Sequence, residues 1–299
     1  MPKVMSGDVA LYYEEAGEGT PILFLHEFLN DYSGWQDQMR HFSRGYRCIS
    51  YSARGVPPSD IPDDAAAYRQ EHFNADALAL LDRLGIDRAH LVGLSMGAYT
   101  ALQLALNHPE RVLGVVAASG ASGGLEATRA AYEAETLAAA DQLETLEGMP
   151  GAAMVSGPTR IQLKRKDPIM WRRNADVISV RPLASAALTL RGVQVGRTPV
   201  CRLREALGAV KTPVLLMAGD EDEACLDVNL WLKRVMPSAQ LAVFPGSGHV
   251  LNLEEPALFN QLTERFLTSV ERGCWRPRDP SALPEQGIAT ALGFDSPER

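Results

Sequence analysis

Ser95 has the surroundings of an activated nucleophile. It is the central residue of a G-x-S-x-G pattern at positions 93–97. The apolar run at residues 89–92 predicts a strand before it, and residues 96–107 predict a helix after it. On such a sharp strand-to-helix turn, the two glycines avoid steric clashes and the serine hydroxyl points out over the edge of a sheet. The pattern in this context favours nucleophilic catalysis.

A serine hydroxyl is a weak nucleophile at neutral pH, so it needs a base and an acid that orients the base. The apolar run 215–218 leads into an acidic turn with Asp220 and Asp222, and a second run, ending at Phe244, leads into a glycine-rich loop with His249. Each candidate follows an expected strand, and a parallel sheet would bring all of them to one edge. The order serine, acid, histidine therefore predicts a catalytic triad, with either aspartate as its acid.

The elements that must position these residues alternate along the chain. Strands are expected at residues 47–51, 89–93, 112–118, 213–218 and 241–244, and helices at residues 35–42, 71–84, 96–107, 226–236 and 256–270. This alternation is typical of an α/β fold, with a mostly parallel sheet flanked by helices. Residues 9–13 and 21–25 flank a glycine-containing turn and predict an antiparallel hairpin at the start of the chain.

The alternation stops between residues 121 and 205. This stretch contains no convincing strand and is rich in helix-forming residues. Because the strand pattern resumes after it, we expect a helical cap inserted into one α/β core, which consists of residues 1–120 and 206–273. Residues 274–299 contain four prolines and little periodicity, so they predict an irregular C-terminal tail.

The expected insertion carries a concentrated positive charge. From Arg160 to Arg204 there are eleven Lys or Arg residues and two Asp or Glu residues. This charge is explained either by a solvated helical surface or an interface with the acidic core, or by capture of an anionic substrate. Trp171, Arg172 and Arg173 are candidate substrate-binding residues, since an aromatic ring beside guanidinium groups suits a planar or carboxylate-bearing molecule.

Composition narrows the range of partners. The 299 residues carry a net charge of −8, which argues against nucleic-acid and membrane-surface partners. No apolar run is long enough for a membrane span and no secretory signal is evident, so we expect a soluble cytoplasmic protein that acts on a small molecule. Four widely spaced cysteines predict reduced thiols rather than a metal site or disulfides. The sequence leaves the oligomeric state open, a homo-oligomer included.

Several of these motifs together resemble the α/β-hydrolase superfamily over about residues 8–120 and 208–270. Besides the serine pattern, they are G-x-x-D at 219–222, G-x-G-H at 246–249, and A-R-G-V-P-P-S-D at 53–60, which is similar to a family loop but has Pro58 in place of a glycine. The resemblance implies the α/β-hydrolase fold, with Ser95 as nucleophile and His249 as general base and then acid. It implies Asp222 as the orienting acid, because the family places the acid three residues after the glycine, and it leaves Asp220 in reserve.

The expected oxyanion hole departs from the family pattern. Such enzymes usually have His-Gly-x after the strand that is expected here at residues 22–25, but this chain has His26-Glu27-Phe28. The resemblance implies that the backbone N–H groups of Phe28 and Met96 stabilise the oxyanion. Glu27 places a carboxyl group beside a site for an anion. We expect it either to point away and bind loop backbone, or to position a water or a cationic substrate group.

These observations predict a serine hydrolase that cleaves a carboxylic ester or related acyl compound through an acyl-enzyme, without a cofactor or metal. One alternative keeps the fold and changes the bond: a C–C bond hydrolase, an enol-lactonase or a cofactor-free perhydrolase that acts on a small carboxylate-bearing substrate. A third reading is a receptor-like α/β-hydrolase that binds a ligand with little turnover, since a fold does not fix a function.

Overall fold

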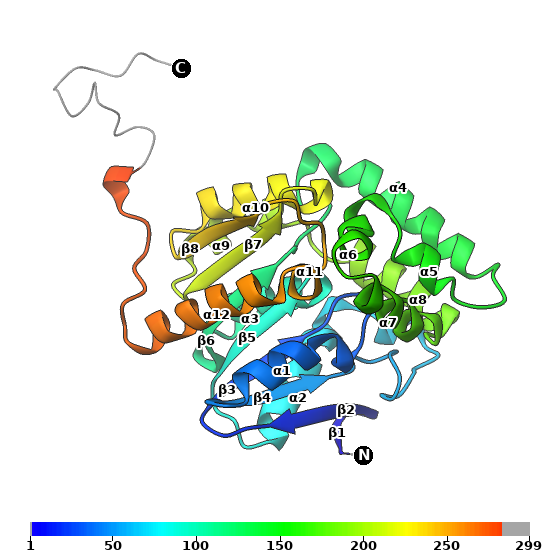
Figure 1. Ribbon diagram of the computed structural model, residues 1–299, viewed down its shortest axis with the longest axis horizontal. Coiled ribbons are helices and arrows are strands. Elements are labelled where there is room, and N and C mark those ends of the chain that lie inside the picture. The colour runs from blue at the N-terminus through cyan, green and yellow to red at the C-terminus, as the bar shows by residue number, and fades with distance from the viewer. Residues whose placement is uncertain (1, 283–299) are drawn as a thin grey trace, which may run out of the picture.

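A computed structural model describes residues 2–282 of the chain, and an eight-stranded sheet runs through its centre (Figure 1). The strands lie in the order β1-β2-β4-β3-β5-β6-β7-β8. They are β1 (Lys3–Ser6), β2 (Val9–Ala16), β3 (Thr20–Leu25), β4 (Tyr46–Tyr51), β5 (Ala89–Leu94), β6 (Val112–Ala118), β7 (Val214–Gly219) and β8 (Ala239–Phe244). From β4 to β8 all neighbours pair in parallel, whereas β1 and β2 are antiparallel. The mostly parallel α/β sheet is therefore confirmed.

The expected opening hairpin is wrong. β2 pairs with β1 and β4, and β3 lies on the far side of β4, between β4 and β5. The last four residues of β3 are all buried, as suits a central strand covered by helices on both faces, whereas β2 is only partly buried near the sheet edge. The short strand β1 was not expected from the sequence.

Two apolar cores lie on opposite faces of the sheet, because successive residues of a strand point to opposite sides. Phe24 of β3 packs in one core with α1 (Gln36–Phe42) and α12 (Pro256–Glu271), which lie in front of the sheet in Figure 1. Leu23 packs in the other with residues of α2 (Gln70–Arg83), α3 (Met96–Asn107) and α10 (Glu223–Val235). The sheet is thus held rigidly between two helical layers.

Helices alone fill the interval between β6 and β7. They are α4 (Glu126–Leu143), α5 (Gly151–Met154), η4 (Pro158–Arg160), α6 (Ile161–Lys166), α7 (Pro168–Ser179), α8 (Leu183–Thr189), the π-helix η5 (Leu190–Val195), η6 (Val200–Leu203) and α9 (Arg204–Ala209). Most of these helices gather at one end of the sheet, whereas the last of them packs beside α10 (Figure 1). A third apolar cluster joins α4, α7 and α8 to Leu29, which follows β3. The division at residues 120 and 206 stays a prediction.

Past α12, the described chain is irregular apart from the turn η7 (Pro280–Ala282), and the expected tail lies outside the described residues from 283 onward. None of the helices in the described part of the chain is both long and apolar enough to cross a bilayer. The four cysteines are free thiols: Cys48 and Cys225 are buried, Cys201 is half-buried and Cys274 is exposed.

Candidate active site

Ser95 occupies the sharp turn between β5 and α3. Its φ of 54° lies in the left-handed region, and its backbone N–H donates to the carbonyl of Ala118 at 2.8 Å. The flanking glycines are required sterically: a Cβ on Gly93 would lie 2.4 Å from the backbone of Gly97, and one on Gly97 would lie 2.1 Å from the carbonyl oxygen of Leu25. The turn holds the half-buried Ser95 side chain above the end of the strand, a strained backbone of the kind found at functional sites.

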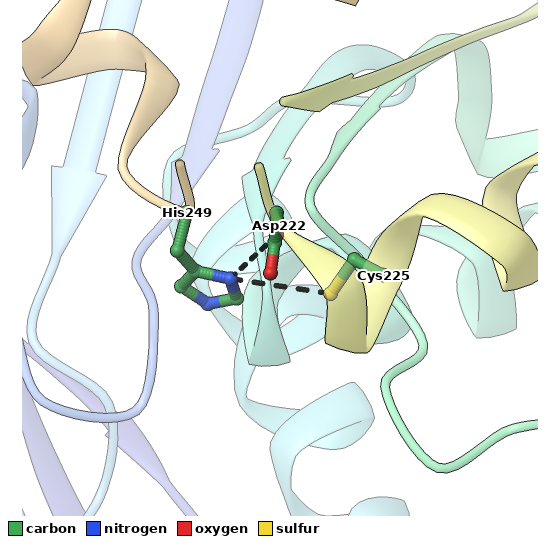
Figure 2. A group of neighbouring side chains, drawn as sticks. All are labelled: Asp222, Cys225 and His249. Carbon is green, nitrogen blue, oxygen red and sulfur yellow. Dashed lines mark hydrogen bonds and ion pairs between the residues drawn. The ribbon is translucent and has the colours of Figure 1, made fainter. Parts of the chain in front are cut away.

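His249 and Asp222 form a hydrogen-bonded pair (Figure 2). Nδ1 of His249 lies 2.8 Å from Oδ2 of Asp222. Asp222 directly precedes α10 and His249 lies in the loop after β8, so the pair joins the ends of two adjacent parallel strands. Burial would raise the pKa of the Asp222 carboxyl, but His249 outweighs it and the pKa is lowered. The ionised acid accepts Nδ1–H, which leaves Nε2 free to act as a base.

Asp220, the alternative candidate for the orienting acid, bonds the backbone of the histidine loop. Its Oδ1 accepts the backbone N–H of Ser247 at 3.0 Å, and the backbone N–H groups of Gly246 and Ser247 lower the pKa of its carboxyl. It therefore fastens the loop that carries His249 rather than touching the imidazole. Of the two aspartates, Asp222 is the one that reaches the histidine.

Ser95, the third residue of the expected triad, follows a strand of the same sheet as Asp222 and His249. Within residues 2–282, the Ser95 hydroxyl is hydrogen-bonded to no side chain, so its contact with His249 stays a prediction. Catalytic hydrogen bonds are often long in the absence of substrate and tighten in the Michaelis complex.

Cys225 was not among the expected site residues. Its Sγ lies 3.9 Å from Nδ1 of His249 (Figure 2). The thiol donates to the carbonyl of Ser119 at 3.1 Å. With Asp222 it completes a set of metal-ligand types whose donor atoms all lie within 4.8 Å of one another. Burial and the charge of Asp222 raise the pKa of the thiol well above its ordinary value, which disfavours the thiolate that a metal requires. We read it as a neutral packing group; its one sequence signal is its position three residues after Asp222.

The two expected oxyanion donors follow neighbouring strands. Met96 is the first residue of α3, so its N–H has no acceptor within the helix. Phe28 follows β3, which pairs with β5 through Leu25 and Gly93. The guanidinium of Arg181 hydrogen-bonds the Phe28 carbonyl and lies 5.1 Å from the centre of its ring. These contacts fix the loop, while the oxyanion role of the two N–H groups stays a prediction.

Glu27 is buried and paired with a cation of the insertion. Both of its carboxylate oxygens accept from the guanidinium of Arg160, with Oε1 2.9 Å from Nη1. Burial would raise the pKa of Glu27, but Arg160 outweighs it and holds the pKa below its ordinary value. The expectation that Glu27 binds loop backbone is wrong, and the cation that it meets belongs to the protein. The two residues are 133 positions apart, so no local pattern could have joined them.

Trp171, Arg172 and Arg173 lie on α7. Nε1 of Trp171 donates to the carbonyl of Val155 at 2.9 Å, and Arg172 and Arg173 are exposed. Arg173 lines a surface groove between α1 and α7. Among the described residues, none of the three is hydrogen-bonded to the expected triad, so a role in substrate binding stays a prediction.

Several of the basic side chains of the insertion form ion pairs with acidic side chains of the same protein. Arg160 pairs with Glu27, Lys166 with Glu255, Arg191 with Asp141 and Glu144, and Arg202 with Glu126. Two of these pairs, those of Arg160 and Lys166, join the insertion to the core. This agrees with the interface reading of the charge.

Comparisons with known proteins agree with this fold. The family model described as alpha/beta hydrolase fold matches residues 20–256. The chain is 32% identical over 277 residues to 2-hydroxy-6-oxo-6-phenylhexa-2,4-dienoate hydrolase of Burkholderia cepacia (87% of this chain, 91% of the relative) and 29% identical over 269 residues to 3-oxoadipate enol-lactonase 2 of Acinetobacter baylyi (87% and 94%). The solved enol-lactonase of Burkholderia xenovorans superposes with a TM-score of 0.77 at 24% identity, covering 89% of this chain and all of that one. A family match over most of the chain, on a sheet and elbow of the expected form, makes this protein a member of the α/β-hydrolase fold family.

Proposed function

We propose that the protein is a serine hydrolase that cleaves a carboxylic ester or related acyl compound through an acyl-enzyme. The observation that carries the proposal is the hydrogen bond between His249 and Asp222 at the ends of β7 and β8, on the sheet edge at which Ser95 follows the parallel strand β5. An ionised acid that holds an imidazole in one tautomer has a direct use when a hydroxyl must lose its proton.

In the first half of the reaction, Oγ of Ser95 attacks the substrate carbonyl carbon while Nε2 of His249 takes the hydroxyl proton. The carbonyl oxygen becomes an oxyanion, which accepts hydrogen bonds from the N–H groups of Phe28 and Met96. The C–O bond to the leaving group then breaks, and the imidazolium of His249 returns the proton to the departing alkoxide. Asp222 stabilises the imidazolium throughout.

In the second half, His249 takes a proton from a water molecule whose oxygen attacks the acyl carbon. The second tetrahedral intermediate uses the same two N–H donors. Its collapse releases a carboxylic acid and returns the proton to Oγ of Ser95.

The test is Ser95→Ala on an activated short-chain ester. We expect turnover to fall by about 10⁶-fold, because the nucleophile and its base act as one unit. A fluorophosphonate probe should label the folded wild type at Ser95 and leave the variant unlabelled. Ser156→Ala, at an exposed position of the insertion, is the matched control and should keep wild-type turnover. Near-wild-type turnover by Ser95→Ala would reject the proposal. Failure of the probe to label wild type would favour the receptor-like reading.

A second candidate changes the bond that is cleaved. It is favoured by the relatives, which include a dienoate hydrolase at 32% identity and an enol-lactonase at 29%. The discriminating measurement is a panel that contains p-nitrophenyl esters with and without an added carboxylate, a 2-hydroxy-6-oxo-dienoate and an enol-lactone. If kcat/KM is highest for one of the last two, the second candidate replaces the ester reading. A preference for neutral esters, with no gain from a carboxylate, would remove it.

A further inference from the structure

One short segment of the insertion contacts three of the core loops that carry the candidate site. We call η4 and α6 together, residues 158–166, the docking segment. Its contacts join Arg160 to Glu27 in the loop after β3, Gln162 to Glu221 in the acid turn, and Thr159 to His249. The expected oxyanion donor, the acid and the base thus lie on loops that share one structural support.

The docking segment is fixed closely to the histidine loop. The backbone N–H of His249 donates to the carbonyl of Thr159 at 2.7 Å. A Cβ on Gly248 would lie 2.2 Å from the same carbonyl oxygen, so the approach needs a glycine there. At the other end of the segment, Nζ of Lys166 lies 2.9 Å from Oγ of Ser247. The base can therefore hardly move without the segment.

The contact to the oxyanion loop is electrostatic. The side chain of Glu27 is 1% exposed and that of Arg160 is 11% exposed, so the pair lies largely out of solvent. Glu27 precedes the expected donor Phe28. The charge of His249 contributes to lowering the pKa of the Glu27 carboxyl. An uncompensated carboxylate here would oppose a developing oxyanion and stabilise the imidazolium. Within residues 2–282, the charged and titratable groups that act on His249 are Asp222, Cys225, Glu27 and Glu254. Arg160 lies near Asp222 and Glu254 as well, and Lys166 lies near Glu254.

We propose that Arg160 is a positioning residue of the candidate site: its guanidinium neutralises Glu27 and holds the docking segment against the oxyanion and histidine loops. The inference rests on the proposed function, because it assigns these loops to catalysis. It gives the insertion a part in the chemistry, and it explains how a glutamate is tolerated beside an oxyanion donor.

The experiment compares Arg160→Gln, Glu27→Gln, the double variant and Arg160→Lys in the full chain with an activated ester. The readout is kcat together with the acid limb of the pH profile of kcat/KM, which reports the essential base of the free enzyme. Arg160→Gln should lower kcat about 10-fold or more and move the acid limb to higher pH by roughly one unit, because a lone carboxylate favours the imidazolium. The double variant should return the limb to its wild-type position and recover most of kcat. Arg160→Lys keeps the charge, so it should leave the limb in place.

For Glu27→Gln we expect the acid limb to shift in the opposite direction. This substitution leaves an unpaired cation near His249, so the acid limb should move to lower pH. This variant and Arg160→Lys keep the inference testable if Arg160→Gln fails to fold. Arg165→Gln is the matched control, since Arg165 is an exposed arginine of the adjoining helix α6, and it should resemble wild type throughout.

The inference is overturned if the acid limb stays in place in both single Gln variants, or if the double variant is no better than Arg160→Gln. A loss of kcat without a shift would mean that the pair only supports the fold. Ser95→Ala distinguishes a failure of the proposed function from a failure of this inference. Full activity of Ser95→Ala rejects the proposed function. If Ser95→Ala is inactive but the acid limb stays in place in the Arg160 and Glu27 variants, only the role of Arg160 is rejected.

Discussion

His26 uses both nitrogens of a neutral ring to fasten the loop that carries Glu27 and Phe28. Its Nε2 accepts the backbone N–H of Ala53 at 2.9 Å, and its Nδ1–H donates to the carbonyl of Glu27 at 2.6 Å. Burial lowers its pKa to about 4, because the charged ring would lose its solvation and Nε2 could no longer accept. The histidine of the family pattern is thus structural here, and it ties the candidate oxyanion loop to the 53–60 loop.

This residue predicts a pH dependence of stability. In the unfolded chain His26 titrates near 6.5, so between pH 6.5 and 4 the unfolded state binds a proton that the folded state does not. Stability should fall as the pH is lowered through this range, by up to about 3 kcal/mol. Urea unfolding at pH 7, 5.5 and 4.5 measures it, and His26→Asn should show a shallower slope. His90, buried with its pKa lowered to about 4, adds a slope that both proteins share. Equal slopes in the two proteins would contradict the assignment.

The two aspartates of the acid turn give a second prediction at this scale. Asp222→Asn should reduce kcat by about 10⁴-fold, because an amide cannot hold the imidazole in the tautomer that leaves Nε2 free. Asp220→Asn should cost far less, since Asp220 bonds the backbone of the histidine loop and not the imidazole in the described part of the chain. Steady-state kinetics of both variants on the same ester decide the matter. If the Asp220 variant lost as much activity as the Asp222 variant, the assignment of the acid would have to be reversed.

Among the elements, the 53–60 loop shows how buried charge fixes a turn. Nε and Nη2 of Arg54 donate to the two carboxylate oxygens of Asp76 in α2, at 2.8 and 2.6 Å, and both side chains are buried. At the far end of the loop, the backbone N–H of Tyr12 donates to Oγ of Ser59 at 2.8 Å. The loop therefore joins α2 to β2, and the backbone N–H of its first residue, Ala53, donates to the ring of His26.

Removing one partner of the buried pair Arg54–Asp76 should lower the free energy of unfolding. Arg54→Met leaves the Asp76 carboxylate buried and unpaired, so we expect a loss of about 3–5 kcal/mol in the free energy of unfolding. The double variant Arg54→Met/Asp76→Leu should recover much of it, because no buried charge remains. Arg40→Met is the control: its pair with Asp37 is exposed and should contribute less than about 1 kcal/mol. Guanidinium unfolding compares the four proteins, and a single variant as stable as the control would contradict the expectation.

On the scale of the whole molecule, the insertion and the sheet share interior surface. Leu29, which follows β3, packs in the same apolar cluster as Ile178 of α7, and the docking segment bonds three core loops. An insertion held in this way should not unfold before the sheet, because its own apolar cluster is completed by the core.

We therefore expect one cooperative transition for both parts. Trp35 is buried against the sheet and Trp171 lies in the insertion, so the variants Trp35→Phe and Trp171→Phe weight the fluorescence toward different regions. Their urea transitions should coincide with each other and with far-UV circular dichroism. An earlier transition seen only while Trp171 is present would mean that the insertion unfolds separately.

The strands and helices that position Ser95, Asp222 and His249 could be predicted because their signals are local. The helix at residues 96–107 and the strand at 112–118 match α3 and β6 residue for residue, since apolar periodicity and the proline at 109 mark their ends. The choice between Asp220 and Asp222 was different. Both follow the same strand, and only the distance to His249 separates them.

The α/β class, the elbow and the motifs of serine, acid and histidine could be derived from the amino-acid sequence, because each motif is recognised from neighbours a few residues apart. Tertiary structure decided that β3 lies beside β4 and β5 rather than β2, and that Glu27 meets Arg160. Strand order depends on which faces the helices cover, and a pair of opposite charges 133 residues apart has no local pattern. Contacts of that kind exist only once the chain has folded.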